Sequence, residues 1–218
     1  MILAFVGQKG GSGETTAALA VASELFARGR RVLVADADPQ GSCRTWAAVA
    51  AEAGLEVPTV AGVGADLYRP GQLPALATTY EATILDCPPR SAPVQRAALM
   101  VADLAIIPCG PSAVDAWALA ETLELVEAAR AVRPELRAAV LLTRKANRTA
   151  LGRGAREALA DCGLPILAAE LGLRVAYQEA PAAGMGPAQY APRDPAAAEV
   201  RALTDELLAL TAAKRRSR

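Results

Sequence analysis

A glycine-rich loop directly after a short apolar segment constrains the fold of this chain more than any other feature. The apolar run covers residues 2–6, and the loop reads Gln8-Lys9-Gly10-Gly11-Ser12-Gly13-Glu14-Thr15-Thr16. Consecutive glycines let backbone N–H groups turn toward bound oxygens, and a following helix directs its positive N-terminus at the same point. The segment therefore predicts a strand, a phosphate-binding loop and a helix.

One residue in the loop conflicts with phosphate binding. The pattern G-x-x-x-x-G-K-[ST], laid over residues 8–15, matches at Gly13 and Thr15. Glu14 stands where the pattern has a lysine that contacts the β- and γ-phosphates. The glutamate puts a negative charge where a positive charge is needed, whereas Thr15 is still placed to hold Mg²⁺ through its hydroxyl.

Apolar and helical segments alternate along the chain. Hydrophobic residues make up 53% of the 218 positions, which is enough for a sizeable core. Strands are expected at 2–6, 31–36, 82–86, 103–107, 138–143 and 164–168. Helices are expected near 15–28, 41–53, 92–101, 113–132 and 149–161. This alternation predicts an α/β fold with a doubly wound, mostly parallel sheet and helices on both faces.

Two segments are less regular. Residues 54–80 are rich in Gly and Pro and are expected to form a short strand, a turn and a helix. Residues 180–195 are expected to form a loop before a last helix that runs to about residue 212. Because we find no linker, no repeat and no apolar stretch long enough to span a membrane, we expect a single domain over 1–218.

The composition limits the possible chemistry. Lys plus Arg and Asp plus Glu number 23 each and His is absent, which excludes a globally basic surface and His-based catalysis or metal sites. The cysteines are widely spaced and form no C-x-x-C pair, so we interpret them as buried apolar thiols in a reducing cytoplasm. They are Cys43, Cys87, Cys109 and Cys162.

Acidic residues end two of the predicted strands. Asp36 and Asp38 lie two residues apart, so we expect their side chains to share a face. Asp38 can orient an attacking water, and Asp36 can support Mg²⁺ or the loop. The strand at 82–86 ends in Asp86 and is followed by Cys87 and two prolines, a Walker B arrangement in which the carboxylate holds a metal-bound water.

These motifs together resemble the deviant Walker A ATPases of the ParA/MinD family. The resemblance rests on Lys9-Gly10-Gly11-Ser12-Gly13-x-Thr15-Thr16, Asp36-x-Asp38-Pro39-Gln40 and Asp86-x-Pro88-Pro89, in this order. It extends over nearly the whole chain, and the small size is similar to the short, ParF-like ParA subgroup.

The resemblance implies a role for each matching residue. Lys9 corresponds to the signature lysine, which should reach the partner's phosphates in an ATP-bound dimer, and Asp38 would position the attacking water. Thr15, Asp86 and Asp36 would hold Mg²⁺. The implied nucleotide contacts are Gly10, Gly11, Ser12, Gly13, Thr15, Thr16, Thr143 and Arg144, with residues 180–190 near the adenine.

Glu14 departs from the family pattern. Opposite charges near 4 Å attract by about 4 kcal/mol at an effective dielectric of 20, and glutamate replaces this attraction by repulsion. A net loss of about 3–4 kcal/mol weakens binding by about two to three decades. We therefore expect poor ATP binding, negligible hydrolysis and a mostly monomeric chain. Two explanations of Glu14 stay open. A native lysine was replaced to disable the ATPase, or the chain is a natural pseudo-ATPase. The intact Lys9, Thr15 and Asp86 favour the first explanation.

Basic residues after the fifth long apolar run are candidates for non-specific DNA binding, which the family performs as an ATP dimer. We single out Lys145, Arg153 and Arg156, with Arg144 and Arg148 beside them. The tail Lys214-Arg215-Arg216-Ser217-Arg218 is a second candidate. Each group also fits an ordinary solvated surface.

We interpret the whole sequence as a ParA-like ATPase that positions a plasmid, a chromosome or a protein cluster. It would use ATP and Mg²⁺, form a homodimer on nucleoid DNA in the cytoplasm, and respond to an unidentified partner protein that stimulates hydrolysis. A MinD-like membrane role stays open, because the last helix carries Val200, Leu203, Leu207, Leu208 and Leu210 before the basic tail. A metabolic ATP-dependent enzyme on the same fold and a non-enzymatic scaffold stay open as well.

Overall fold

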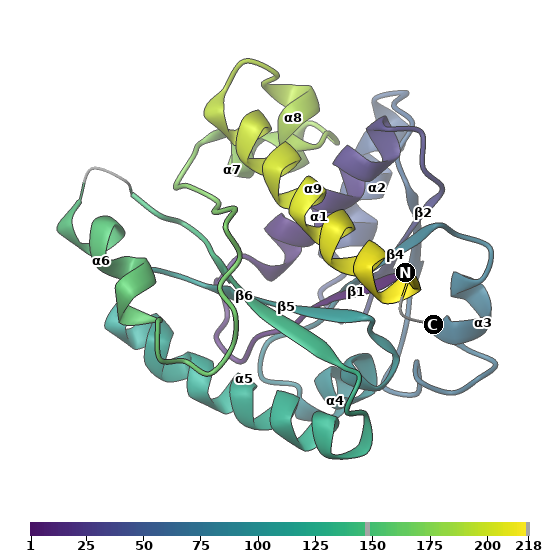
Figure 1. Cartoon of the computed structure of the whole chain (residues 1–218). Coiled ribbons are helices and arrows are strands. Elements are labelled where there is room, and N and C mark those ends of the chain that lie inside the picture. Colours follow the sequence, from purple (N-terminus) through teal and green to yellow (C-terminus); the bar gives the residue numbers. More distant parts are fainter. Residues whose placement is uncertain (147–148, 217–218) are drawn as a thin grey trace.

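A six-stranded parallel sheet forms the centre of the molecule (Figure 1). The computed structural model of the chain describes residues 1–146 and 149–216. The strand order is β3-β2-β4-β1-β5-β6, and every neighbouring pair is parallel. The strands are β1 (Ile2–Phe5), β2 (Val32–Asp36), β3 (Thr59–Gly62), β4 (Ala82–Asp86), β5 (Leu104–Cys109) and β6 (Arg137–Leu142). The predicted doubly wound α/β fold is confirmed.

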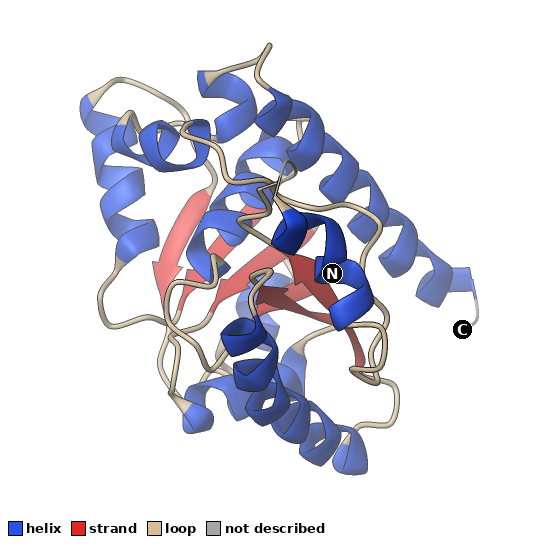
Figure 2. Ribbon diagram, turned by 90° about the vertical axis from the view of Figure 1, so that its left-hand side faces the viewer, coloured by secondary structure: helices blue, strands red, loops and turns tan. Residues whose placement is uncertain are grey.

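Helices cover both faces of the sheet, as Figure 2 shows by the blue layers on either side of the red strands. The longer ones are α1 (Glu14–Ala27), α2 (Ser42–Glu52), α4 (Ala92–Val101), α5 (Ala113–Val132), α6 (Ala150–Ala158) and α9 (Pro195–Arg216). The short ones are α3 (Leu73–Ala77), α7 (Ala176–Ala182) and α8 (Pro187–Tyr190). One core cluster joins the sheet to α1, α2 and α9, and the other joins it to α4 and α5.

The central strand β1 is buried on both faces because its side chains alternate between the two clusters. Leu3 and Phe5 lie in the cluster beneath α1, and Ala4 and Val6 lie in the opposite one. All four are fully buried, which explains why β1 is a continuous apolar run rather than an alternating one.

Two predicted elements differ from the structure. Residues 164–168 do not form a strand, because only a single bridge joins Ile166 to Val140 of β6. Pro165 lacks the N–H group that a longer ladder would need. The predicted loop at 180–195 is wrong in part, since it contains the end of α7 and all of α8.

The apolar stripe of α9 packs on the sheet rather than facing outward. Val200, Leu203 and Leu207 are at most 1% exposed and belong to the core cluster beneath α1.

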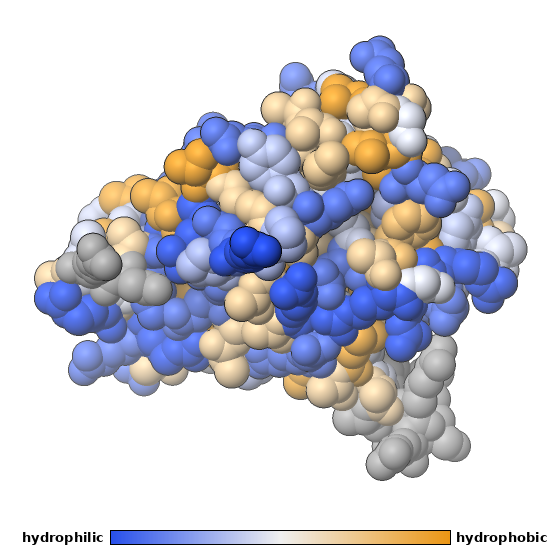
Figure 3. All heavy atoms as spheres, turned by 90° about the horizontal axis from the view of Figure 1, so that it is seen from above, coloured by the Kyte–Doolittle hydropathy of each residue, from blue (hydrophilic) through white to orange (hydrophobic). Residues whose placement is uncertain are grey.

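Figure 3, viewed from the top of Figure 1 where α7 and α8 lie, shows hydrophilic and hydrophobic residues intermixed. Within the described residues, no helix is both long and apolar enough to cross a bilayer.

Two glycines with positive φ allow a prediction about the packing of α7 on α2. A Cβ on Gly184 (φ 69°) would lie 2.5 Å from the Cα of Ala50, whereas a Cβ on Gly29 (φ 76°) would meet nothing within 4 Å. We expect Gly29→Ala to lower the free energy of unfolding by about 1–2 kcal/mol through left-handed strain alone. Gly184→Ala should lose a further ~1–3 kcal/mol, because the backbone of α2 must move.

The measurement is urea denaturation of both variants beside the wild type. Equal losses for the two variants would show that α2 yields freely to the added methyl group, contrary to this account.

Candidate nucleotide-binding site

The candidate site lies where β1, β2 and β4 end beside one another. In the sheet register Phe5 of β1 is opposite Asp86 of β4, and Asp86 is opposite Asp36 of β2. Because parallel strands place their carboxyl ends on one edge, the glycine-rich loop and the acidic residues of two motifs meet there.

The glycine-rich loop leaves the start of α1 open to an anion. Gly11 and Gly13 have φ of 79° and 101°, and Gly13 is the N-cap of α1 without a side-chain cap. Gly13 therefore offers no side chain to cap the first N–H groups of the helix. Two hydroxyls hold the loop in shape: Ser12 Oγ donates to the carbonyl of Lys9 (2.9 Å), and Thr143 Oγ1 donates to the carbonyl of Ser12 (2.7 Å).

Thr15 and Asp86 form a pair that fits a magnesium ion. Thr15 Oγ1 donates to Asp86 Oδ2 at 2.8 Å, and Asp86 Oδ1 is buried with no hydrogen-bond partner in the part of the chain that the structure describes. Burial raises the pKa of Asp86 to about 6, against the opposing hydrogen bonds from Thr15 and Cys43, and Asp36 and Asp38 raise it further. A hydroxyl beside an unsatisfied carboxylate oxygen matches the oxygen ligands that Mg²⁺ prefers.

Glu14 lies inside the phosphate loop rather than in solvent. It is 5% exposed, and its Oε1 is buried and has no hydrogen-bond partner among the described residues. A Cβ on Gly7 would lie 2.3 Å from this oxygen, so the carboxyl group packs directly on the glycine that opens the loop. Burial raises the pKa of Glu14 to about 7, although the amides of Glu14 and Gly13 act in the opposite direction. A carboxyl group therefore lies where the pattern has an ammonium.

Lys9 is held by an acidic residue of its own chain. Its Nζ donates to Asp115 Oδ1 at 2.6 Å, and Arg144 donates to the same oxygen at 3.0 Å. Asp115 is 6% exposed and forms a capping box with Ser112 at the start of α5. Although burial opposes it, hydrogen bonds from Lys9 and Ser112 lower the pKa of Asp115. Asp115 is absent from the site residues expected from the sequence, yet the spacing Ser112-x-x-Asp115 before a helical segment is a readable signal.

Asp36 and Asp38 do not both lie at the end of a strand: Asp36 ends β2, and Asp38 lies in the following loop. β2 ends at Asp36, so the strand alternation that predicted a shared face does not extend to Asp38. Asp36 is 1% exposed and accepts hydrogen bonds from the Asp38 amide (3.1 Å) and from Arg44 Nε (3.3 Å). Asp38 is half-buried in the loop and accepts from the Gln40 amide at 2.8 Å.

A pocket opens beside the loop, next to Thr16. Thr143 and Arg144, which the sequence predicts as adenine contacts, line it together with Gly11 and Gly13. The rest of the lining is Leu171, Gly172, Leu173, Arg174, Tyr177 and Gln178. Residues 180–190 do not line this pocket, because this segment packs on α1 and α2. Trp46 Nε1, for example, donates to the carbonyl of Met185 at 3.2 Å.

The predicted basic patch is partly neutralised. Lys145 and Arg156 both pair with Glu170, with Arg156 Nη2 lying 2.9 Å from Glu170 Oε1. Arg153 is exposed on α6, one turn before Arg156. Arg148 and the side chains of the basic tail lie outside the described residues.

Comparisons with known proteins agree on one family. The model of the CobQ/CobB/MinD/ParA nucleotide binding domain matches residues 3–188. "Maintenance of carboxysome distribution protein A" from Halothiobacillus neapolitanus is 33% identical over 94% of this chain and 95% of its own length. "Chromosome-partitioning ATPase Soj" from Thermus thermophilus is 31% identical, with 95% of each chain covered.

Solved structures show the same fold at low identity. Apo McdA from Cyanothece superposes with a TM-score of 0.76 at 17% identity, covering 94% of this chain and 98% of its own. The septum site-determining protein MinD from Pyrococcus horikoshii, complexed with Mg-ADP, superposes with a TM-score of 0.72 at 18% identity, covering 94% and 95%.

The buried position of Glu14 makes stability depend on pH. Its folded-state pKa of about 7 lies above the ordinary value of 4.5, so between these values the folded chain holds a proton that the unfolded chain has released. The stability that comes from this bound proton is fully present below the unfolded-state pKa and is lost as pH rises through the folded-state pKa. The free energy of unfolding falls by about 3 kcal/mol in total. We expect the stability difference between wild type and Glu14→Gln to change by this amount between pH 4.5 and 8.

Urea denaturation at both pH values measures the effect. Asp86 titrates in both proteins, so the part of its contribution that does not depend on Glu14 cancels in the comparison. Parallel stability curves for wild type and Glu14→Gln would contradict the buried position of Glu14.

Proposed function

Because this chain belongs to the CobQ/CobB/MinD/ParA family of nucleotide-binding domains, we propose that it is a ParA-like protein that positions intracellular cargo. Its working cycle would use ATP and Mg²⁺, dimerisation and non-specific DNA binding, with Glu14 holding the cycle at a low level. The cargo would be a plasmid, a chromosome or a protein assembly.

The convergence of Lys9, Thr15 and Asp86 around the glycine-rich loop is the observation that carries this proposal. Lys9 and Thr15 belong to the loop and Asp86 belongs to the motif that ends β4, and the two motifs meet at one sheet edge, although Lys9 is paired with Asp115. The relatives matched over nearly their full length have names that refer to carboxysome distribution and chromosome partitioning, which supports a positioning role.

The residues have distinct proposed tasks. Bound Mg-ATP would supply the phosphoryl group whose hydrolysis drives the cycle. The loop amides from Gly10 to Gly13 and the hydroxyl of Thr16 would orient phosphate oxygens. Thr15 and Asp86 would hold the metal, with Asp36 in support, and Asp38 would orient water. Thr143 and Arg144 would lie against the nucleotide base.

Lys9 must exchange partners for a dimer to form. Its ammonium is paired within the chain to Asp115, and its side chain is 29% exposed. In the proposed dimer it would leave Asp115 and reach the phosphates of the second copy. Arg144, which shares Asp115, would then be the remaining cation on that carboxylate.

Glu14 acts against nucleotide binding in two ways. It removes the ammonium of the pattern, an attraction of about 4 kcal/mol at 4 Å and an effective dielectric of 20. It also fills the space beside Gly7 with a carboxyl group. A pKa of about 7 leaves this group only partly ionised near neutral pH, so its repulsion is smaller than that of a full charge. The loss of the lysine's attraction is therefore a larger electrostatic effect than the repulsion by the Glu14 carboxylate.

DNA and an unidentified protein that stimulates hydrolysis are the proposed partners, and the cytoplasm with its nucleoid is the proposed location. Arg153, Arg156 and Lys145 form the proposed DNA-binding patch, in which Glu170 offsets part of the charge. A membrane role is less favoured, because the apolar stripe of α9 is buried in the core.

A metabolic ATP-dependent enzyme is the second candidate. The family model includes CobQ and CobB, and cobyrinic acid a,c-diamide synthase from Mycobacterium smegmatis superposes with a TM-score of 0.66 over 83% of this chain. The relatives from Halothiobacillus and Thermus, both above 30% identity, have positioning names, which favours the first candidate. A non-enzymatic scaffold is the outcome if ATP binding cannot be restored.

Replacement of Glu14 by lysine should restore nucleotide binding. We expect Glu14→Lys to tighten the Kd for Mg-ATP by about 100-fold or more, since roughly 3–4 kcal/mol is regained. Isothermal titration calorimetry measures the affinity, and light scattering after size-exclusion chromatography measures the ATP-dependent dimer. Glu14→Gln is the matched control, because it removes the charge without adding an ammonium, and its gain should be smaller.

The dimer should depend on Lys9. In the Glu14→Lys background, Lys9→Ala should keep ATP binding and abolish the ATP-dependent dimer. Our proposal fails if Glu14→Lys gains no affinity over wild type, or if its dimer forms equally well without Lys9.

The basic patch should set DNA affinity in the same background. With ATP present, Arg153→Glu combined with Arg156→Glu should weaken binding to random duplex DNA at least 10-fold and flatten its salt dependence. Arg69→Glu, on the segment between β3 and α3 at the opposite edge of the sheet, is the control and should have little effect. Fluorescence anisotropy at several salt concentrations gives both quantities, and equal effects of the two replacements would rule out the patch.

A further inference from the structure

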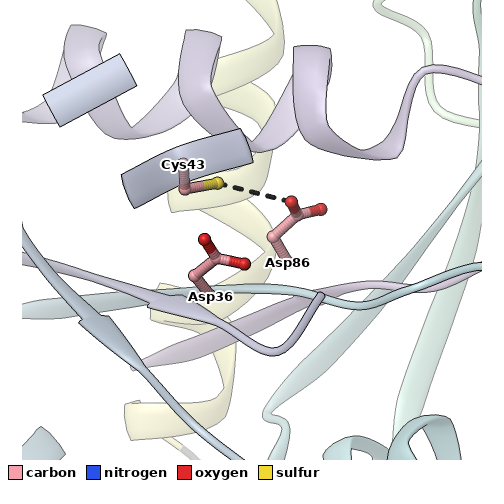
Figure 4. A group of neighbouring side chains, drawn as sticks. All are labelled: Asp36, Cys43 and Asp86. Carbon is pink, nitrogen blue, oxygen red and sulfur yellow. Dashed lines mark hydrogen bonds between the residues drawn. The ribbon is translucent and has the colours of Figure 1, made fainter. Parts of the chain in front are cut away.

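A second group of ligand-type side chains meets beside the magnesium position. Asp36 at the end of β2, Asp86 at the end of β4 and Cys43 in the first turn of α2 point toward one another (Figure 4). One ligand atom from each lies within 4.8 Å of the other two. All three residues are at most 1% exposed. From its sequence spacing alone, Cys43 was expected to be only an apolar core residue.

The group holds more acceptor capacity than the chain fills. Asp86 Oδ2 accepts from the Cys43 thiol (3.3 Å) and from Thr15, while Asp86 Oδ1 is buried and has no partner. A buried carboxylate oxygen without a donor or a cation is costly. The cation that pairs with the group is Arg44, whose Nε lies 3.3 Å from Asp36 Oδ2. This ion pair serves Asp36 and leaves Asp86 Oδ1 unsatisfied.

We propose that Asp36, Cys43 and Asp86 form a binding site for a thiophilic divalent cation of the zinc class. The cation binds to this site when no nucleotide is bound. Three protein ligands of this kind leave a fourth position for water, as in open zinc sites. Binding displaces the thiol proton of Cys43 to solvent, and the thiolate becomes a ligand. The cation, together with Arg44, would balance the charges of two carboxylates and one thiolate.

The ligand spacing suits such a cation. Zinc bonds to sulfur at about 2.3 Å and to carboxylate oxygen at about 2.0–2.2 Å, so tetrahedral ligand atoms lie roughly 3.5 Å apart. The Sγ of Cys43 and Oδ2 of Asp86 are already 3.3 Å apart, and a ligand atom of Asp36 lies within 4.8 Å of those of the other two residues, so rotations of the side chains would complete the site.

The thiol selects against magnesium. Mg²⁺ takes oxygen ligands in strict octahedral geometry, whereas thiolate ligands favour Zn²⁺ and similar soft cations. Asp86 belongs to both this site and the proposed Mg²⁺ site, so the two cations would exclude one another. Binding of the soft cation itself needs neither ATP nor a particular residue at position 14.

Cobalt(II) is the probe, because a thiolate ligand gives it a charge-transfer absorption in the near ultraviolet. We expect chelator-treated wild-type chain, without nucleotide, to bind one Co²⁺ with this absorption and to lose it when Zn²⁺ is added. Cys43→Ser should abolish the absorption. Cys162→Ser, a half-buried thiol that contacts the carbonyl of Leu164, is the matched control and should keep it.

Asp36→Asn provides a second variant with the thiol intact, and it should weaken Co²⁺ binding at least 10-fold. Absence of the thiolate absorption in wild type overturns the proposal, whatever the folding of the variants. Its persistence in Cys43→Ser, or its loss in Cys162→Ser alone, also overturns it. Since no nucleotide is present, failure here leaves the ATP-binding test of Glu14→Lys unaffected.

Discussion

The parallel alignment of β1, β2 and β4 is the constraint on which the rest of the molecule depends. It brings three carboxyl ends to one edge, so the glycine-rich loop, Asp36 and Asp86 meet although they are far apart in the sequence. The apolar side chains of β1 lie in both core clusters, which fixes the start of the loop between them. Any cation, phosphate or water at this edge is held by residues whose places the sheet sets.

Charge is distributed unevenly at that edge. The basic groups Lys9 and Arg144 both lie on Asp115, at the start of α5. Glu14 and Asp86, deeper in the site, each keep a buried oxygen without a partner. A conventional loop lysine at position 14 would replace the Glu14 carboxyl group by an ammonium near Asp86. Without that ammonium, Asp86 Oδ1 has no cation among the described residues, while burial raises the pKa of the Glu14 carboxyl group that stands in its place.

The fold could be predicted because each buried parallel strand is a continuous apolar run. Within the site, the loop and Asp86 could be predicted because their motifs are local in sequence. The pairing of Lys9 with Asp115 and the approach of Cys43 to Asp86 depend on how α5 and α2 pack on the sheet, which no local pattern encodes. The same reason accounts for the lining of the pocket beside the loop, which comes in part from residues 171–178 and not from 180–190.

The central claim is that the Glu14 carboxyl group lies buried inside the phosphate loop. A carbon-13 NMR titration of the Glu14 side-chain carboxyl, assigned by comparison with Glu14→Gln, measures its pKa directly. This account predicts a midpoint near pH 7. A midpoint near the ordinary value of 4.5 would place the carboxylate in solvent and contradict the account.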